Sequence, residues 1–310
     1  MKLIPLASTG RKTTQLGFGC AFPNSMTKND ALRLMDAAFD AGIRHFDVAP
    51  YYGPAEGYVG EFLARHAGEV TVTTKFGLLP PSPRPLHIQV ARKLLGPAVR
   101  ALRRRLPSAP KSSAGMSAKA VFTAEAARRS LDNSLRLFHL DTIDVFLMHE
   151  PTVSDLADEQ LLQFLNDSVA GKRIGVFGIG GDSSRVPGLY NQRRQFCDIL
   201  QFDWSALSPD SDWAFPGSFQ IHYWVFTQKE SPTHAQTLQA LHAALLKRSA
   251  FCDQWSRQID LDIGDIRNLA ALMLKAALMQ FPDSGVLFTS SKPENILRNV
   301  GVAEDAAWEE

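Results

Sequence analysis

The sequence predicts an α/β protein, a single closed (β/α)8 barrel of the TIM type with an N-terminal β-hairpin and long βα loops. Eight short apolar runs alternate with helical patterns along the 310 residues. The runs are almost continuously apolar, which is typical of parallel strands buried on both faces. No GxGxxG motif opens a helix after the first run, which argues against an open dinucleotide-binding sheet. We therefore expect one domain over residues 1–310.

Composition excludes several classes of protein. Hydrophobic residues make up 45% of the chain, and 33 basic against 32 acidic residues give a formal net charge of +1. This balance gives no overall attraction to nucleic acid or to a membrane surface. Cys20, Cys197 and Cys252 lie far apart and form no CxxC motif, which indicates a reducing compartment and no structural metal. Without an apolar stretch of signal-peptide or membrane-spanning length, we expect a cytoplasmic protein with no transmembrane segment.

The strands are predicted from short apolar runs bounded by turn residues. Residues 2–15 predict a hairpin outside the main sheet, with its turn at Thr9-Gly10-Arg11. The core strands are expected at residues 16–21, 43–48, 69–77, 142–149, 173–181, 198–205, 221–226 and 285–291.

The helices are predicted from apolar residues that recur on one face. Thr27 is expected to cap the first helix, which Gly42 ends. A second helix passes through Tyr58, Phe62 and Leu63. Later helical patterns cover residues 123–138, 156–170, roughly 185–194, 234–257, 264–280 and 293–304.

One connection differs from the others in length and charge. No acidic residue occurs from Val70 to Ala124, whereas Arg92, Lys93, Arg100, Arg103, Arg104, Arg105 and Lys111 crowd its centre. We predict a basic flap or lid at about residues 78–122. A solvated lid helix is the simpler interpretation, and attraction to an anionic substrate, lipid surface or partner is the alternative.

Four ionisable side chains fall at or just beyond the C-terminal ends of consecutive predicted strands: Asp47, Tyr52, Lys75 and His149. In a barrel these ends converge on one rim, so the four groups are expected around one cavity. A structural ion pair and a hydrogen-bonded core histidine are the simpler readings of the same residues. We expect Trp204, Trp213, Trp224, His45 and His222 to be packing residues, although Trp213 stands in a loop that could line the substrate pocket.

This set of residues suits proton transfer at a carbonyl or alcohol oxygen. A free tyrosine is a poor acid or base at neutral pH, and a lysine ammonium beside it favours the phenolate and lowers its pKa. Asp47 would pair with Lys75, and His149 could hydrogen-bond the phenol. The set holds no nucleophile, metal cage or phosphate clamp, so it needs a partner that moves electrons, such as a nicotinamide.

The chain resembles the aldo-keto reductases over nearly its whole length. The matching segments are LGFGCA, AGIRHFDVAPYYG, VTTKFG, FTAEAARRSLDNSLRLFHLDTIDVFLMHEP, GKRIGVFGIGG, LQFDWSAL and LFTSSKPENILRNV. The resemblance implies that Tyr52 is the general acid/base, that Lys75 and His149 tune it and orient the carbonyl, and that Asp47 pairs with Lys75. It also implies a (β/α)8 barrel, a small-molecule carbonyl or alcohol substrate, a monomer by default, and NADP(H) as cofactor with NAD(H) as the alternative.

The nicotinamide contacts that the resemblance implies are less complete. Gln201 matches the family glutamine that bonds the nicotinamide amide. Gly180 and Gly181 stand where the family usually has Ser-Asn, so that contact must come from the backbone or from elsewhere, and Asp182 is a weak substitute. Phe226 is expected as the aromatic that stacks on the nicotinamide, with Tyr223 as second choice.

The remaining cofactor contacts are expected at the two ends of the chain. Gly19 and Cys20 end the first strand, near the expected nicotinamide. Ser290, Ser291 and Lys292 match the phosphate-binding region and can present donors at a helix N-terminus. Asn299 matches the family residue at the adenine, and Asn295 stands where an arginine often binds the 2′-phosphate of NADP. Glu150 is unusual against the Ser or Trp often found after the histidine.

Four functions follow from these observations. The first is an NADP(H)-dependent oxidoreductase that interconverts an aldehyde or ketone and its alcohol. The second is an NAD-dependent sugar (aldose) dehydrogenase. The third is a cofactor-binding regulatory subunit with little turnover, resembling potassium-channel β subunits. The fourth is a barrel isomerase or lyase that uses Lys75 as a Schiff base, against which the expected pairing with Asp47 speaks.

Overall fold

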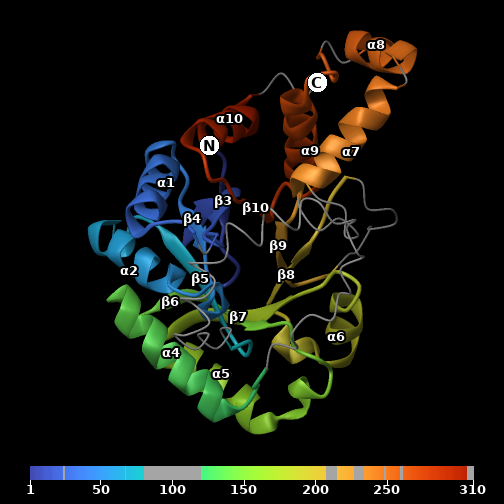
Figure 1. Cartoon of the computed structure of the whole chain (residues 1–310). Coiled ribbons are helices and arrows are strands. Elements are labelled where there is room, and N and C mark those ends of the chain that lie inside the picture. Colours follow the sequence, from blue (N-terminus) through green and yellow to red (C-terminus); the bar gives the residue numbers. More distant parts are fainter. Residues whose placement is uncertain are drawn as a thin grey trace, which may run out of the picture.

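Eight parallel strands close into a barrel in the computed structural model, in the order β10-β3-β4-β5-β6-β7-β8-β9 (Figure 1). The structure describes residues 1–23, 25–66, 68–79, 120–206, 215–226, 234–247, 249–258 and 261–305. The strands are β3 (Leu16–Gly19), β4 (His45–Asp47), β5 (Thr71–Phe76), β6 (Ile143–His149), β7 (Ile174–Gly181), β8 (Ile199–Asp203), β9 (Phe219–Tyr223) and β10 (Gly285–Phe288). The predicted (β/α)8 fold is confirmed.

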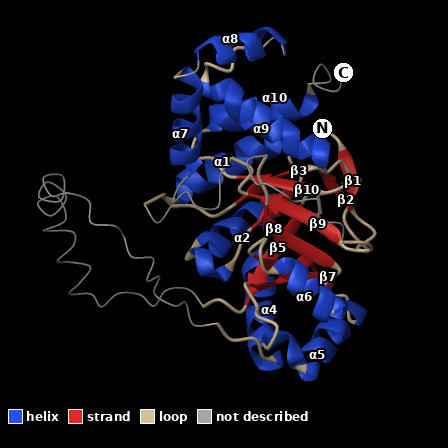
Figure 2. Ribbon diagram, turned by 90° about the vertical axis from the view of Figure 1, so that its right-hand side faces the viewer, coloured by secondary structure: helices blue, strands red, loops and turns tan. Residues whose placement is uncertain are grey.

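The helices surround this barrel (Figure 2). They are α1 (Lys28–Asp40), α2 (Ala55–His66), α4 (Ala124–Phe138), α5 (Glu159–Ala170), α6 (Val186–Gln192), α7 (His234–Leu246), α8 (Ser249–Gln258), α9 (Ile266–Gln280) and α10 (Pro293–Glu304). Short 3-10 turns occur at η1 (Pro50–Tyr52), η2 (Asp155–Ala157) and η3 (Arg194–Phe196). Thr27 caps α1 as predicted, because its side chain accepts a hydrogen bond from Asp30 N. No helix in the described ranges is long and apolar enough to cross a membrane.

The predicted hairpin closes the N-terminal end of the barrel. It consists of β1 (Leu3–Pro5) and β2 (Lys12–Thr14), which pair only with each other. Leu6, at its turn, is fully buried among the apolar side chains inside the barrel. The Arg11 guanidinium pairs with Asp144 at 2.7 Å and donates to the Val70 carbonyl at 2.9 Å. The hairpin therefore seals the end of the barrel opposite the carboxyl ends of the strands.

Strand alternation divides the core into an inner and an outer layer. On β6, Val145 and Leu147 belong to the inner apolar cluster, whereas Phe146 and Met148 pack outward beneath the helices. The same alternation continues across the closed sheet through the strand registers, which pair Lys75 with Leu147 and His149 with Gly180. Side chains at the ends of several strands are thereby directed into the barrel mouth.

Several predicted segments are longer than the observed elements, and two of these differences affect the description of the fold. The single helix expected at residues 234–257 is two helices, α7 and α8, which run in different directions (Figure 1). The strand expected at residues 221–226 is β9, which begins at Phe219 and ends at Tyr223. Trp224 has a φ of 59°, a left-handed conformation that is incompatible with a continuing strand. Phe226 consequently lies in the turn beyond β9.

Most of the predicted basic flap, residues 80–119, lies outside the described residues, as does Trp213. The two ends of that segment lie next to each other, because Leu78 and Ala120 form an isolated antiparallel bridge.

His222 is a buried histidine in the layer between β9 and α9. It is fully inaccessible, and its ring stacks on Phe281 with centroids 3.7 Å apart. Neither of its ring nitrogens has a hydrogen-bond partner among the described residues. Burial lowers the pKa of His222 to about 3. The folded protein thus holds this imidazole neutral, whereas the unfolded chain exposes it to water.

We expect His222 to make the protein sensitive to acid. Its pKa is lower in the folded than in the unfolded chain, so the stability it allows at neutral pH is lost as pH falls below about 6.5. Linkage predicts that the free energy of unfolding decreases by roughly 2 kcal/mol between pH 7 and pH 5 on account of this group. His222→Phe keeps the aromatic stack and should remove this part of the decrease, measured by urea unfolding at both pH values.

His139 provides the control, because it is exposed at the C-terminal end of α4. Its left-handed backbone (φ 54°) tolerates asparagine, so His139→Asn removes a histidine without removing a buried ring. Equal acid sensitivity in the wild type and His222→Phe would contradict the argument.

Candidate active site

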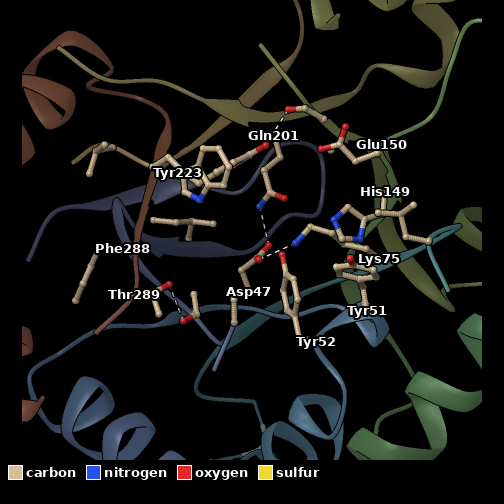
Figure 3. Close-up of a pocket in the computed structure, with 18 of the residues that line it drawn as sticks. Asp47, Tyr51, Tyr52, Lys75, His149, Glu150, Gln201, Tyr223, Phe288 and Thr289 are labelled. Carbon is tan, nitrogen blue, oxygen red and sulfur yellow. Dashed lines mark hydrogen bonds and ion pairs between the residues drawn. The ribbon is translucent and has the colours of Figure 1, made fainter. Parts of the chain in front are cut away.

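A cavity of about 630 Å³ opens at the carboxyl ends of the barrel strands. Its size is that of a small-molecule site. Asp47, Tyr52, Lys75 and His149 all line it, although they come from η1 and from three different strands (Figure 3). The barrel thus brings together the four groups that the sequence singled out.

Lys75 and Asp47 form a buried ion pair at the base of the cavity. The distance from Lys75 Nζ to Asp47 Oδ1 is 2.7 Å, and both side chains are almost fully buried. The second carboxylate oxygen of Asp47 accepts a hydrogen bond of 2.6 Å from Gln201 Nε2. Burial by itself lowers the pKa of Lys75, but the charge of Asp47 and the hydrogen bond to it raise that pKa, which lies above its ordinary value. Lys75 is therefore an ammonium at neutral pH.

Tyr52 lies beside this pair on the η1 turn. Its hydroxyl points toward Lys75 and Asp47 (Figure 3), and Lys75 Nζ lies 5.6 Å from the centroid of its ring. Burial raises the pKa of Tyr52, and the charge of Lys75 lowers it only in part. The net lowering of the Tyr52 pKa expected from the sequence is therefore wrong. Tyr52 is a protonated phenol at neutral pH.

His149 is the last residue of β6, and its ring lies beside that of Tyr52. Its ring lies 6.0 Å from the Tyr52 ring and 5.8 Å from the Tyr51 ring, in both cases nearly perpendicular. Burial, together with the charge of Lys75, lowers the pKa of His149 to about 3. This histidine is accordingly neutral at physiological pH, with hydrogen-bonding nitrogens and no charge.

The wall formed by the end of β7 carries no side chains. A Cβ on Gly180 would lie 3.3 Å from Gln201 Oε1, and a Cβ on Gly181 would lie 4.0 Å from Glu150 Oε2. Asp182 does not line the cavity, and its carboxylate accepts hydrogen bonds from the backbone and hydroxyl of Ser184. The two glycines therefore leave a flat wall that exposes backbone and the Gln201 amide.

Tyr223 and Phe226, the two aromatic residues considered for the nicotinamide, both line the cavity. Tyr223 ends β9, and its hydroxyl donates to the Gly181 carbonyl at 3.0 Å. Phe226 lies beyond the strand and is partly buried against the outer core. Of the two, Tyr223 is the one that a strand holds against the β7 wall.

The N-terminus of α10 approaches the same cavity. Ser290 and Ser291 line it, and Ser290 Oγ accepts a hydrogen bond of 3.1 Å from the Lys292 backbone. Lys292 is the N-cap of α10, and Asn295 and Asn299 lie within the helix; all three are outside the cavity lining. The Asn295 side chain accepts a hydrogen bond of 3.2 Å from Arg298.

At the end of β3 only one of the two expected residues reaches the cavity. Gly19 lines it, and its carbonyl accepts a hydrogen bond from Thr289. Cys20 is fully buried and does not line the cavity, and burial holds the pKa of its thiol well above its ordinary value. It is a buried packing side chain in this structure.

Several cavity residues were given no role from the sequence, among them Thr289, Glu150 and Trp224. Thr289 follows the inward-facing Leu287 by two positions, so strand alternation would have indicated it. Glu150 was marked only as unusual. Trp224 was expected to be a packing residue, but its side chain is 48% exposed and lines the cavity, because its left-handed backbone carries it off the end of β9.

Comparisons with known proteins give the family and the fold that this chain resembles. Residues 15–183 match the model of the aldo/keto reductase family. The chain is 32% identical over 160 residues to D-threo-aldose 1-dehydrogenase of a Pseudomonas species, covering 48% of this chain and 44% of that protein. It is 30% identical over 156 residues to pyridoxal 4-dehydrogenase of Microbacterium luteolum, covering 47% of this chain and 42% of that protein. The matches thus span less than half the length of these relatives.

A solved structure extends the likeness to the whole fold. The holo form of the aldo-keto reductase AKR11C1 from Bacillus halodurans superposes with a TM-score of 0.67 over 98% of this chain and 91% of that chain, at 17% sequence identity. At this identity the match supports the fold.

Removing the charge of Asp47 should destabilise the protein, because it leaves the Lys75 ammonium buried without its counter-charge. Asp47→Asn keeps the size of the side chain, and we expect a loss of roughly 3–5 kcal/mol in the free energy of unfolding. The double variant Asp47→Asn/Lys75→Met removes both charges and should recover part of the loss. Denaturant unfolding of the two single variants and the double variant measures the coupling. Additive losses would show that the pair is not coupled.

Proposed function

Because the chain belongs to the aldo/keto reductase family, we propose that it interconverts a carbonyl compound and its alcohol with a nicotinamide cofactor, and that Tyr52 is the general acid/base. The observation that carries this proposal is the meeting of Tyr52 with the Lys75–Asp47 pair and His149 in one cavity. Proton transfer needs a titratable group next to the reacting oxygen of the substrate. Tyr52 is such a group, and it lies in the cavity beside Lys75 and His149.

The residues around the cavity fit a nicotinamide cofactor. The flat wall at Gly180 and Gly181 leaves room for a planar ring, and Gln201 Oε1 lies at this wall as an acceptor for a carboxamide. Tyr223 is the better-placed aromatic to stack on that ring, in place of Phe226, because β9 holds it against the same wall. The hydroxyl groups of Ser290 and Ser291 at the α10 N-terminus suit the phosphates. A bound nicotinamide would supply the hydride.

In the reducing direction, Tyr52 donates its proton to the carbonyl oxygen as that oxygen gains negative charge. Its raised pKa keeps the proton on the phenol until it is needed. The neighbouring Lys75 ammonium then stabilises the phenolate that is left, and Asp47 holds this ammonium charged and in place. His149, being neutral, hydrogen-bonds the carbonyl oxygen and orients it without competing for the proton. In the oxidising direction Tyr52 accepts the alcohol proton as its phenolate, which the Lys75 ammonium stabilises.

NADP(H) is the proposed cofactor, and NAD(H) is the alternative. Lys292 is the cation at the α10 N-terminus that suits an additional phosphate, but Asn295 carries no charge. An aldose dehydrogenase that uses NAD is the second candidate function, and the relative named D-threo-aldose 1-dehydrogenase supports sugar aldehydes and lactols as substrates.

Tyr52→Phe tests the proposal. The variant lacks the proton donor but keeps the ring, so we expect turnover of a carbonyl panel to fall about 10²- to 10⁴-fold. Dissociation constants for NADPH and NADH, from fluorescence titration, should stay within about two-fold of wild type, since the hydroxyl is proposed to act on the substrate. Tyr51→Phe is the matched control, because Tyr51 lines the same cavity on the same turn. A near-normal rate for Tyr52→Phe would refute the assignment.

The pH dependence of reduction should lack an acidic limb from His149. A group whose pKa is lowered to about 3 stays neutral throughout the assay range, so kcat/KM should be flat between about pH 5 and pH 8. The raised pKa of Tyr52 places loss of the proton donor on the alkaline side. Initial rates with a non-ionising aldehyde measure the profile. A limb near pH 6.5 that His149→Gln abolishes would show that the histidine acts in its charged form.

A further inference from the structure

The cavity contains a carboxylate that the proposed reaction does not use. Glu150 follows His149 at the end of β6 and lines the cavity. Its side chain is 28% exposed, and Figure 3 shows its carboxylate on the same side of the cavity as Gln201. An acid next to the group proposed to orient the carbonyl lies within reach of the rest of the substrate.

This carboxylate is held in place from two directions. The backbone of Glu150 has a φ of 63°, which costs about 1–2 kcal/mol for a residue with a Cβ. Its amide donates to the Gly180 carbonyl at 2.7 Å, which fixes that conformation. The side chain forms an ion pair with Arg185, the residue before α6. Such local strain is concentrated at binding and catalytic positions.

The space in front of the carboxylate is open. A Cβ on Gly181 would meet Glu150 Oε2 at 4.0 Å and no other atom within that distance, so a larger residue here would extend toward the carboxylate. Trp224 adds an exposed apolar ring to the lining of the same cavity. The cavity lining therefore includes a hydrogen-bond acceptor and an aromatic surface, and Arg185, outside the lining, holds the acceptor in place.

We propose that Glu150, positioned by Arg185, determines specificity by binding a hydroxyl group of a polyhydroxylated carbonyl substrate. The inference rests on the proposed oxidoreductase function and assigns a substrate class to its site. A hydroxyl donates to the carboxylate in a charge-assisted hydrogen bond, while Arg185 pairs with the same carboxylate from outside the cavity lining. The pair is neutral as a whole and does not select for a cation. The face of Trp224 packs against the C–H groups of the same carbon chain.

The test compares two aldehydes with the same four-carbon skeleton, threose and butanal, which differ in their hydroxyl groups. Glu150→Ala removes the acceptor. We expect kcat/KM for threose to fall about 10- to 100-fold, the worth of a hydrogen bond to a charged group, and kcat/KM for butanal to stay within about two-fold. Glu150→Gln keeps the shape of the side chain and should show a smaller loss with threose. Retained butanal turnover shows that the variants are folded.

Glu159→Ala is the matched control. Glu159 also pairs with an arginine, Arg193, but it lies at the start of α5 outside the cavity lining. Its removal should leave kcat/KM unchanged for both threose and butanal. NADPH binding, measured by fluorescence, should be equal in all variants, and a parallel loss in Glu150→Ala would show that the carboxylate serves the cofactor and would overturn the inference.

A binding measurement separates this inference from the proposed function. Threitol, the sugar alcohol of threose, is titrated against wild type and Glu150→Ala with NADP present, and binding is followed by ligand-observed NMR. Binding at least ten-fold weaker in the variant supports the inference even without turnover. Equal binding, or equal loss of kcat/KM for threose and butanal, overturns it while leaving the proposed function intact. Absence of turnover of both aldehydes by the wild type counts against the proposed function.

Discussion

The buried ion pair between Lys75 and Asp47 is the interaction on which the candidate site depends. Two charges inside a barrel are costly to desolvate, so they persist only where their geometry is good and their remaining hydrogen bonds are satisfied. Gln201 Nε2, from the far side of the barrel, donates a hydrogen bond of 2.6 Å to the second carboxylate oxygen of Asp47. Three strands that are distant in sequence must therefore hold their register, because a slip of one residue would turn any of these side chains toward the helices.

Burial then sets the state of every proton around this pair. It raises the pKa of Tyr52 and lowers the pKa of His149 to about 3, while Asp47 keeps Lys75 charged. One side chain is left as a proton donor, one as a neutral hydrogen-bonding group and one as a fixed positive charge. The apolar lower half of the barrel and the hairpin that seals it keep water from the base of the cavity.

The wall of the cavity at the end of β7 has no side chains, because its two residues are glycines. Gly180 and Gly181 project nothing into the space that Glu150 and Trp224 border. Both residues occupy left-handed backbone conformations just after the ends of β6 and β9. The barrel strands thus carry the proposed chemistry, whereas residues directly after the strands form the surface that we assign to substrate selection.

Much of this arrangement could be predicted from local patterns. The apolar runs located all eight barrel strands, and the helix at residues 293–304 has the bounds that were expected. Asp47, Lys75 and His149 were found because each stands at the end of such a run. The resemblance to a family then supplied roles for them, and those roles remain proposals. The pattern failed at residues 221–226, because an apolar run does not reveal that Trp224 leaves the strand conformation.

The sequence by itself determined where the strands lie and in what order they follow one another. It therefore also determined which residues stand at the C-terminal ends of the strands. It could not determine the direction of the Tyr52 pKa, because this depends on how burial and the Lys75 charge balance in three dimensions. Nor could it show that Gln201 bonds Asp47, that Tyr223 and not Phe226 faces the β7 wall, or that Arg185 holds Glu150. Each of these contacts joins residues from separate strands or loops. Only the closure of the barrel brings them within hydrogen-bonding distance.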